Sequence, residues 1–408
     1  MIGRYRALFS VPEFSRLLFS SVLGRLPSGM FSLAILLFVH ARTSSFLAAG
    51  VAVGAFALAG AATGPPLGAL VDRIGQRRVL LTTAAGQAAL LGALVAVGGL
   101  GSPTAVIVAL AALCGSLQPP IAGCVRALWS TLAVDEQALE TAYALDATAQ
   151  EVIWTLGPLL VGVAAALASP AAAVLVCAAV TLGGTVFFAT SQLSSGWRPA
   201  PREGSRGALG ASGLRALLGT VLFAGVVIGA VEVGLPALAV DAGSRWAAGP
   251  LLALFSLGSM AGGLAYSAKS WSMPMGLRYR TMLAGMAIAV APLIAVHSLG
   301  AAFLLSVLAG LGIAPMLSSQ FSLVGALAAP GTSTEAFAWH RAATIAGMAA
   351  GSALGGSLIG ARGAQGAFAL GCLSVVLAWM LAALWRWRLD PDARPAEELA
   401  LPTQAART

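Results

Sequence analysis

Twelve apolar stretches, each close to the length of a membrane-spanning helix, follow one another along the 408 residues of this chain. A helix needs about 20 apolar residues to cross the hydrocarbon layer of a bilayer. The stretches are 15–39, 45–70, 79–100, 104–128, 141–168, 170–193, 214–240, 247–268, 281–297, 300–328, 338–361 and 364–386. Only 9% of the residues are charged, against about 25% in soluble proteins. The sequence therefore predicts an all-α membrane protein with twelve transmembrane helices.

Basic residues between the stretches predict the orientation. If both termini are cytoplasmic, the inner side holds Arg4, Arg6, Arg16, Arg73, Arg77, Arg78, Arg198, Arg202, Arg206, Arg215, Lys269, Arg278, Arg280, Arg386, Arg388, Arg394 and Arg407. Only Arg42, Arg245 and Arg362 would face outward. This bias is typical of cytoplasmic loops and predicts a multi-pass protein of the inner (cytoplasmic) membrane. The net charge of +8 then reflects topology, and no nucleic-acid partner is expected.

The chain repeats itself with a period near half its length. The segment SSFLAAG at 44–50 corresponds to SRWAAG at 244–249, and AYALD at 142–146 corresponds to AFAWH at 336–340. These offsets place the second stretch on the eighth and the fifth on the eleventh. We therefore expect two pseudo-symmetric six-helix bundles. The predicted units are a first bundle at 1–193, a cytoplasmic linker at 194–213, a second bundle at 214–388 and a cytoplasmic tail at 389–408.

Residues 68–78, between the second and third stretches, read GALVDRIGQRR. This string resembles the signature loop of the major facilitator superfamily. The alternative is an ordinary basic loop on the inner side of the membrane. Gly68 permits close helix contact, Asp72 offers a negative charge to a helix N-terminus, and Gly75 allows a tight turn. Three arginines would hold the loop at the anionic leaflet: Arg73, Arg77 and Arg78.

The resemblance implies a secondary transporter whose substrate sits between the two bundles near the membrane midplane. It also implies that Asp72 faces the N-terminus of the eleventh span, where Arg341 would reinforce a cytoplasmic gate and His340 would either titrate or lie in the interfacial zone. Gly157 and Pro158 resemble, in abbreviated form, the Gly-Pro motif of drug/proton antiporters, which favours export. The second, eighth and eleventh spans carry glycines at every fourth position: Gly60, Gly64, Gly68, Gly258, Gly262, Gly347, Gly351 and Gly355. Such glycines give smooth helix faces, which the resemblance places across the boundary between bundles, the alternative being ordinary packing of small residues.

Ionisable residues inside the spans are candidates for function, because a charge at the bilayer centre costs at least ~2.5 kcal/mol. Arg25 and Glu151 lie at similar depth, so we expect an ion pair, either structural or involved in substrate binding or proton coupling. Glu232 has no cation in its own span and is the first candidate for a proton carrier, the alternative being an inert vestibule residue. Asp146 is a further proton-coupling candidate, although Asp146 and Arg126 are expected to form a latch with the motif loop.

The resemblance implies that the cavity walls come mainly from the first, fourth, seventh and tenth spans. Besides Arg25 and Glu232, the expected lining comprises Met30, Phe31, Gln118, Trp154, Met316, Ser319, Gln320 and Phe321, although any apolar one of them would equally suit a packed core. A mostly apolar lining suits bulky amphipathic solutes.

No enzymatic signature competes with transport. The chain has no GxxxxGK[ST] phosphate loop and no HExxH pair, and its four cysteines lack CxxC spacing, so neither a cofactor nor a metal is expected. We predict a monomeric, non-enzymatic secondary transporter whose partners are a small-molecule substrate, protons and the lipid bilayer. Proton-coupled efflux of hydrophobic or amphipathic compounds is the expected activity. The alternatives are proton-coupled uptake or facilitated diffusion of a metabolite, and a non-transporting membrane receptor on the same fold.

Overall fold

The computed structural model describes residues 13–132, 135–198, 207–244, 247–269 and 271–391. Within these ranges the chain is helical, without a strand, and twelve helical segments are long and apolar enough to span a membrane, as predicted. Parts of the predicted linker and tail lie outside the described residues, and so do Arg4, Arg6, Arg202, Arg206, Arg245, Arg394 and Arg407.

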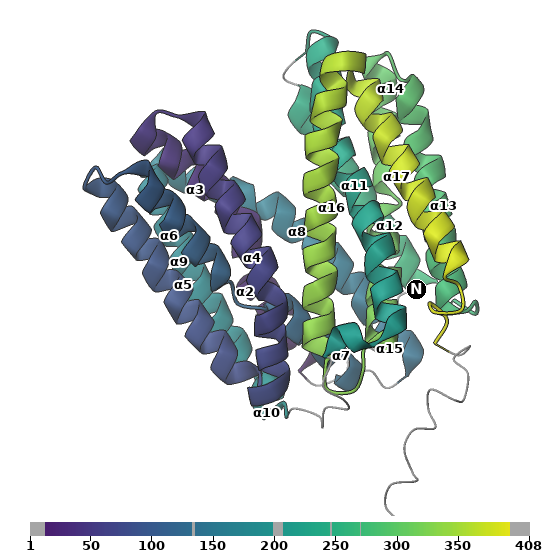
Figure 1. The fold of residues 1–408 in the computed structure, drawn as a ribbon, viewed down its shortest axis with the longest axis horizontal. Coiled ribbons are helices and arrows are strands. Elements are labelled where there is room, and N and C mark those ends of the chain that lie inside the picture. The colour runs from purple at the N-terminus through teal and green to yellow at the C-terminus, as the bar shows by residue number, and fades with distance from the viewer. Residues whose placement is uncertain (1–12, 133–134, 199–206, 245–246, 270, 392–408) are drawn as a thin grey trace, which may run out of the picture.

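Six spans and a short helix form a first group, shown in purple to blue in Figure 1. Its helices are α2 (Phe14–Arg25), α3 (Pro27–Thr43), α4 (Phe46–Ile74), α5 (Gln76–Gly99), α6 (Thr104–Ser116), α7 (Ile121–Leu132), α8 (Glu136–Leu167), α9 (Pro170–Ala189) and α10 (Gln192–Gly196). The first span consists of α2 and α3, and the fourth consists of α6 and α7.

Six more spans form a second group, shown in teal to yellow. A short 3₁₀ turn, η1 (Ala208–Gly210), precedes α11 (Ser212–Asp241), α12 (Ala248–Ala268), α13 (Met275–Val290), η3 (Ala291–Ala295), α14 (Leu299–Gly310), α15 (Ile313–Leu327), α16 (Ser333–Arg362) and α17 (Ala364–Leu384). The ninth and eleventh helices begin several residues before the predicted stretches, because polar residues such as Arg278 and Glu335 lie in their first turns.

Within the described part of the chain, three spans are interrupted. The first breaks at Leu26, next to Pro27, which lacks a backbone N–H. The fourth breaks at residues 117–120, where Pro119 and Pro120 follow one another, and the tenth breaks at residues 311–312. Irregular backbone at membrane depth is tolerated where protein or a cavity surrounds it. The break in the fourth span brings Gln118 to the wall of a small cavity.

The internal repeat appears in the packing as well as in the sequence. Gly115, at the end of α6, lies so close to the carbonyl of Phe56 on α4 that an added methyl group would overlap it. Gly310, at the end of α14, makes the same contact with the carbonyl of Phe255 on α12. The same close helix crossing therefore occurs in both groups, between the second and fourth spans and between the eighth and tenth.

The predicted crossing between bundles is wrong for most of the glycine positions, which instead serve the alternative, ordinary packing of small residues. Gly347 and Gly351 contact the backbone of α11, and Gly258 contacts that of α14, so these glycines pack helices within the second group. Gly68 alone among the predicted glycines meets the other group, at the backbone of Glu335. Repeats of small residues indicate a close helix crossing but carry no information about which helix is the partner.

The two groups meet at one end and diverge at the other. In Figure 1 they approach each other around α7 and α15 at the lower end and separate toward α3 and α14 at the upper end. Contacts between groups join α4 and α7 to α16, and α8 to α12 and α15. Residues 68–78 lie at the end where the groups meet, which we call the motif end.

Candidate functional site

A cavity of about 580 Å³ lies between the two groups. Its lining comes from α7 and α8 on one side and from α11, α12, α15 and α16 on the other. This volume lies within the range of about 300–1,000 Å³ typical of small-molecule sites. Its charged or titratable lining residues are Arg126, Glu151, Glu232, His340 and Arg341, and the rest of the lining is mainly apolar.

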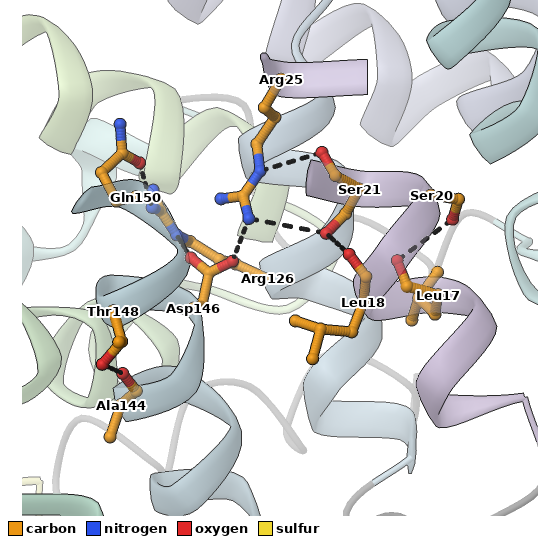
Figure 2. A network of polar contacts seen from close by, with 10 residues as sticks. All are labelled: Leu17, Leu18, Ser20, Ser21, Arg25, Arg126, Ala144, Asp146, Thr148 and Gln150. Atoms are coloured by element: carbon orange, nitrogen blue, oxygen red, sulfur yellow. Dashed lines mark hydrogen bonds and ion pairs between the residues drawn. The ribbon is translucent and has the colours of Figure 1, made fainter. Parts of the chain in front are cut away.

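A buried three-charge cluster, formed by Arg25, Asp146 and Arg126, lies beside this cavity in the first group. Figure 2 shows the two guanidinium groups flanking the Asp146 carboxylate. Nη2 of Arg25 lies 2.8 Å from Oδ1 of Asp146, and Nε of Arg126 donates to Oδ2 at 2.7 Å. All three side chains are at most 4% exposed. Nη1 of Arg25 is buried and has no hydrogen-bond partner in the described part of the chain.

The predicted contact between Arg25 and Glu151 is wrong. The Glu151 carboxylate instead accepts a hydrogen bond from the hydroxyl of Ser259 on α12, at 2.8 Å. Asp146 and Glu151 are five residues apart, which rotates their side chains by about 140° around the helix. Equal depth therefore did not mean the same face, and Asp146 is the residue that faces Arg25.

The Arg126 guanidinium is also held by an aromatic ring. It stacks on Phe321 of α15, with its central carbon 3.7 Å from the ring centroid, and Nη2 lies 3.5 Å from Oε1 of Gln150. Arg341, on α16, has a neutral partner, since its Nη2 donates to Oε1 of Gln118 at 3.3 Å. Arg341 lines both the large cavity and a small one of about 50 Å³, and Arg25 also lines the small cavity.

A chain of hydrogen bonds behind the cavity was not predicted. Nε2 of His340 lies 2.8 Å from Oε1 of Gln320, and Nε2 of Gln320 donates to the Tyr279 hydroxyl at 3.3 Å. That hydroxyl lies 2.9 Å from Oγ1 of Thr220. Because a carbonyl oxygen only accepts, this amide orientation makes the imidazole Nε2 a donor. Thr220 lies in apolar sequence and Tyr279 lies between two arginines, and neither belongs to a motif, so nothing in the sequence pointed to them.

The expected cavity lining is partly wrong. Phe31 and Gln118 line the small cavity, and Trp154 and Phe321 line the large one. Four expected lining residues are instead packed in the interior, at most 1% exposed: Met30, Met316, Ser319 and Gln320. Neighbouring positions on a helix point in different directions, so a single span contributes to the cavity wall only through one face.

Asp72 closes the motif end by capping a helix of the other group. Its two carboxylate oxygens accept the backbone N–H groups of Thr334 and Glu335, at 3.2 and 2.9 Å, in the first turn of α16. A methyl group on Gly68 would lie 2.9 Å from the Thr334 carbonyl oxygen, so glycine permits this approach. Gly75 ends α4 with φ of 97°. The three arginines of the loop are exposed: Arg73, Arg77 and Arg78.

A second connection at this end was missed in the sequence. Arg278 of α13 forms a salt bridge with Glu140 of α8, and its side chain is 1% exposed. The predicted latch between the motif loop and the pair of Arg126 and Asp146 is wrong, because these two residues bind each other instead. His340 and Arg341 lie roughly 10 Å along α16 from its first residue, at the cavity, and not at its opening.

Comparisons with known proteins agree with this architecture. A family model described as Major Facilitator Superfamily matches residues 17–273. An uncharacterised MFS-type transporter, y4rN, of Sinorhizobium fredii is 33% identical over 184 residues. That alignment covers 45% of this chain and 45% of the relative, so the chain spans about half the length of the curated relative that it matches.

Two solved structures share the fold. The human organic anion transporter MFSD10 (TETRAN) has a TM-score of 0.72 and 19% identity, and the match covers 91% of this chain and 99% of that one. A bacterial homologue of the iron transporter ferroportin, in an outward-facing state, has a TM-score of 0.75 and 13% identity, with coverage of 91% and 98%. At these identities the likeness concerns the fold alone.

Proposed function

This chain belongs to the major facilitator superfamily, and we propose that it is a secondary transporter that moves small molecules across the cytoplasmic membrane by alternating access. The observation that carries the proposal is a cavity lined by both groups of helices, next to an end closed by the contact of Asp72 with α16. Such a site can be exposed to one side at a time if the two groups rock against each other.

The proposed orientation follows from the basic residues. With residues 68–78 and both termini in the cytoplasm, the conformation described here is closed inward and open outward. The Asp72 cap and the Glu140–Arg278 salt bridge are then the contacts that must break for the cavity to open inward. We propose that the protein works as a monomer, because each chain contains both groups of helices and a complete cavity.

Cysteine labelling tests alternating access without a known substrate. Ser256 lines the cavity, whereas Ser306 is fully buried in α14 and serves as a matched control. In a Cys372→Ser background, Ser256→Cys should react with a membrane-impermeant maleimide from the outside, and from the inside only after the protein has switched. Ser306→Cys should stay unlabelled from both sides. Simultaneous labelling of Ser256→Cys from both sides would indicate a channel and contradict the proposal.

Proton coupling is proposed for Glu232, with Glu151 as a second carboxylate in the same cavity. Within the described residues neither carboxylate has a cationic partner, so either could bind and release a proton as the cavity changes sides. Efflux is the proposed direction, on the resemblance of Gly157 and Pro158 to the antiporter motif. Gly157 also packs against Gly29 of α3, so this motif has a structural role that is independent of direction.

The other candidate functions have distinct experimental signatures. A broad ligand screen by thermal shift, followed by proton flux in liposomes, separates them. Uptake would appear as substrate accumulation driven by an inward proton gradient, and facilitated diffusion as flux that does not respond to pH. A non-transporting receptor would bind ligand while Ser256→Cys remained accessible from one side only.

A further inference from the structure

We propose that Arg126 and Arg341 form a head-group site at the motif end of the cavity, and that the substrate is an amphipathic organic anion. Its head would be a carboxylate, sulfonate or phosphate, and its body would be apolar. This inference rests on the transport function proposed above, because it names the substrate class of the same cavity.

The first argument is an excess of positive charge. Arg25 and Arg126 share the single carboxylate of Asp146, which leaves the three-charge cluster with one uncompensated positive charge. Arg341 adds a second, because its partner Gln118 is neutral and no carboxylate pairs with it among the described residues. Buried charges are rarely retained without a partner or a function. An anionic group bound beside these arginines would supply the missing charge.

The second argument is the geometry of the donors. Asp146 holds Arg126 through Nε, and the ring of Phe321 lies against the face of its guanidinium. The group is therefore fixed before any ligand arrives, and a planar guanidinium matches the two oxygens of a carboxylate or phosphate. Both Arg126 and Arg341 are among the residues that line the cavity.

The acidic residues of the cavity lie farther from the motif end. Arg341 is eight residues, or roughly 12 Å, from the start of α16, whereas Glu151 and Glu232 are roughly 22 and 30 Å from the starts of α8 and α11. All three helices begin at the motif end. Glu232 is therefore the acidic residue farthest from the motif end, whereas Glu151 directly follows Gln150, which contacts Arg126.

The remaining lining suits an apolar body. Apolar side chains of α8, α12, α15 and α16 line the cavity, among them Trp154, Leu252, Phe255, Ile313, Leu317 and Met348. Such a surface lacks the many polar partners that a sugar requires. A molecule with its charged group on the arginines and its apolar part along this surface would satisfy both regions.

The test uses three probes that share one apolar body and differ in charge: 4-phenylbutyrate, 4-phenylbutylamine and 4-phenylbutanol. Their binding would be measured by titration calorimetry on the full chain in nanodiscs of zwitterionic phosphatidylcholine, which excludes anionic lipid as the ligand. We expect the carboxylate to bind at least about tenfold more tightly than the amine or the alcohol, the lower limit for hydrogen bonds to a charged group.

Variants locate the site. Arg341→Gln should weaken carboxylate binding by at least about tenfold. Arg362→Gln removes the same charge from an exposed position on the same helix and should leave binding unchanged. Should Arg341→Gln fail to fold, Arg341→Lys keeps the charge without the planar fork and should retain only part of the affinity. An amine that binds as tightly as the carboxylate, no carboxylate binding at millimolar concentration, or unchanged binding in both Arg341 variants would overturn the proposal.

The failure of this inference can be told apart from failure of the transport proposal. If Ser256→Cys changes its accessible side but the carboxylate has no advantage, transport stands and the anion site falls. If the carboxylate binds through Arg341 while Ser256→Cys never becomes accessible from the inside, the site stands and transport falls.

Discussion

At the scale of single residues, Asp146 is the carboxylate on which the charge balance of the first group depends. It forms ion pairs with two arginines from two other helices, so it joins α2, α7 and α8. Its three-charge cluster is not symmetric: removing one arginine leaves a matched pair, whereas removing the carboxylate leaves two buried cations facing each other. The order of destabilisation among the variants therefore tests the cluster.

Asp146→Asn should destabilise the protein more than Arg25→Met does. Removing one partner of a buried ion pair typically costs about 3–5 kcal/mol, and here two cations lose their partner at once. Arg25→Met should cost less, because Arg126 still pairs with Asp146. The measurement is thermal unfolding of the purified proteins, with the exposed Arg362→Gln as control. An Arg25→Met variant that melts below Asp146→Asn would contradict this arrangement.

Glu232→Gln should uncouple transport from the proton gradient. Glu232 lines the cavity, and glutamine mimics the protonated carboxylic acid permanently because it can neither bind nor release a proton. We expect the variant to bind substrate and exchange it down its own gradient, but to lose accumulation driven by pH. Flux in proteoliposomes with and without an imposed pH difference measures this. If flux in the variant still responds fully to the pH difference, another group carries the proton. Glu151, which also lines the cavity, would then be tested next.

At the scale of elements, the first turn and the middle of α16 are held by different contacts. Its first turn is bound by Asp72 of the other group, and its middle packs through glycines against α11. The helix therefore belongs structurally to the second group, and its N-terminus is bound to the first group by Asp72. Changes in the first turn should therefore alter the balance between conformations, whereas changes in the middle of the helix should alter stability.

Asp72→Asn should weaken closure of the motif end. An acidic group at a helix N-terminus contributes about 0.3–2 kcal/mol, and an amide keeps only part of its acceptor capacity. Transport should fall while expression is maintained, and Ser256→Cys should become more reactive from the inside. Arg77→Gln changes an exposed charge of the same loop and serves as a comparison. Unchanged transport and labelling in Asp72→Asn would refute the gate assignment.

Gly351→Ala should destabilise the protein, whereas Gly356→Ala on the same helix should not. An added methyl group at Gly351 would overlap the carbonyl of Val226, while no atom outside the local helix lies within 4 Å of the corresponding position at Gly356. Overpacking typically costs about 1–3 kcal/mol. Melting temperatures of the two variants provide the comparison, and equal values would show that α11 and α16 are less closely packed than described here.

The spans and the Asp72 cap could be predicted from the sequence, whereas most contacts between side chains could not. Apolar length is sufficient to locate twelve spans, and GALVDRIGQRR is specific enough to place Asp72 at the N-terminus of α16. The partner of Arg25 was mistaken, because depth along a helix says nothing about direction around it. The salt bridge of Glu140 with Arg278 was invisible, since its residues are 138 positions apart and carry no motif.

At the scale of the whole molecule, two connections of different chemistry close the motif end. Asp72 binds backbone N–H groups, whereas Glu140 binds the buried side chain of Arg278. They join different helix pairs, α4 with α16 and α8 with α13. Opening therefore requires both to break, and rigid motion of one group against the other would break them in the same step.

The three-charge cluster lies wholly within the first group, and this has a consequence for the response to voltage. If water fills the open cavity, the membrane potential drops mainly across the closed end, and the drop moves to the opposite end when access switches. The net positive cluster then crosses part of the field without leaving its helices. A full crossing of one charge is worth about 2.3 kcal/mol per 100 mV. We expect capacitive currents on a solid-supported membrane during switching, reduced in Arg25→Met, even when the transported species carry no net charge.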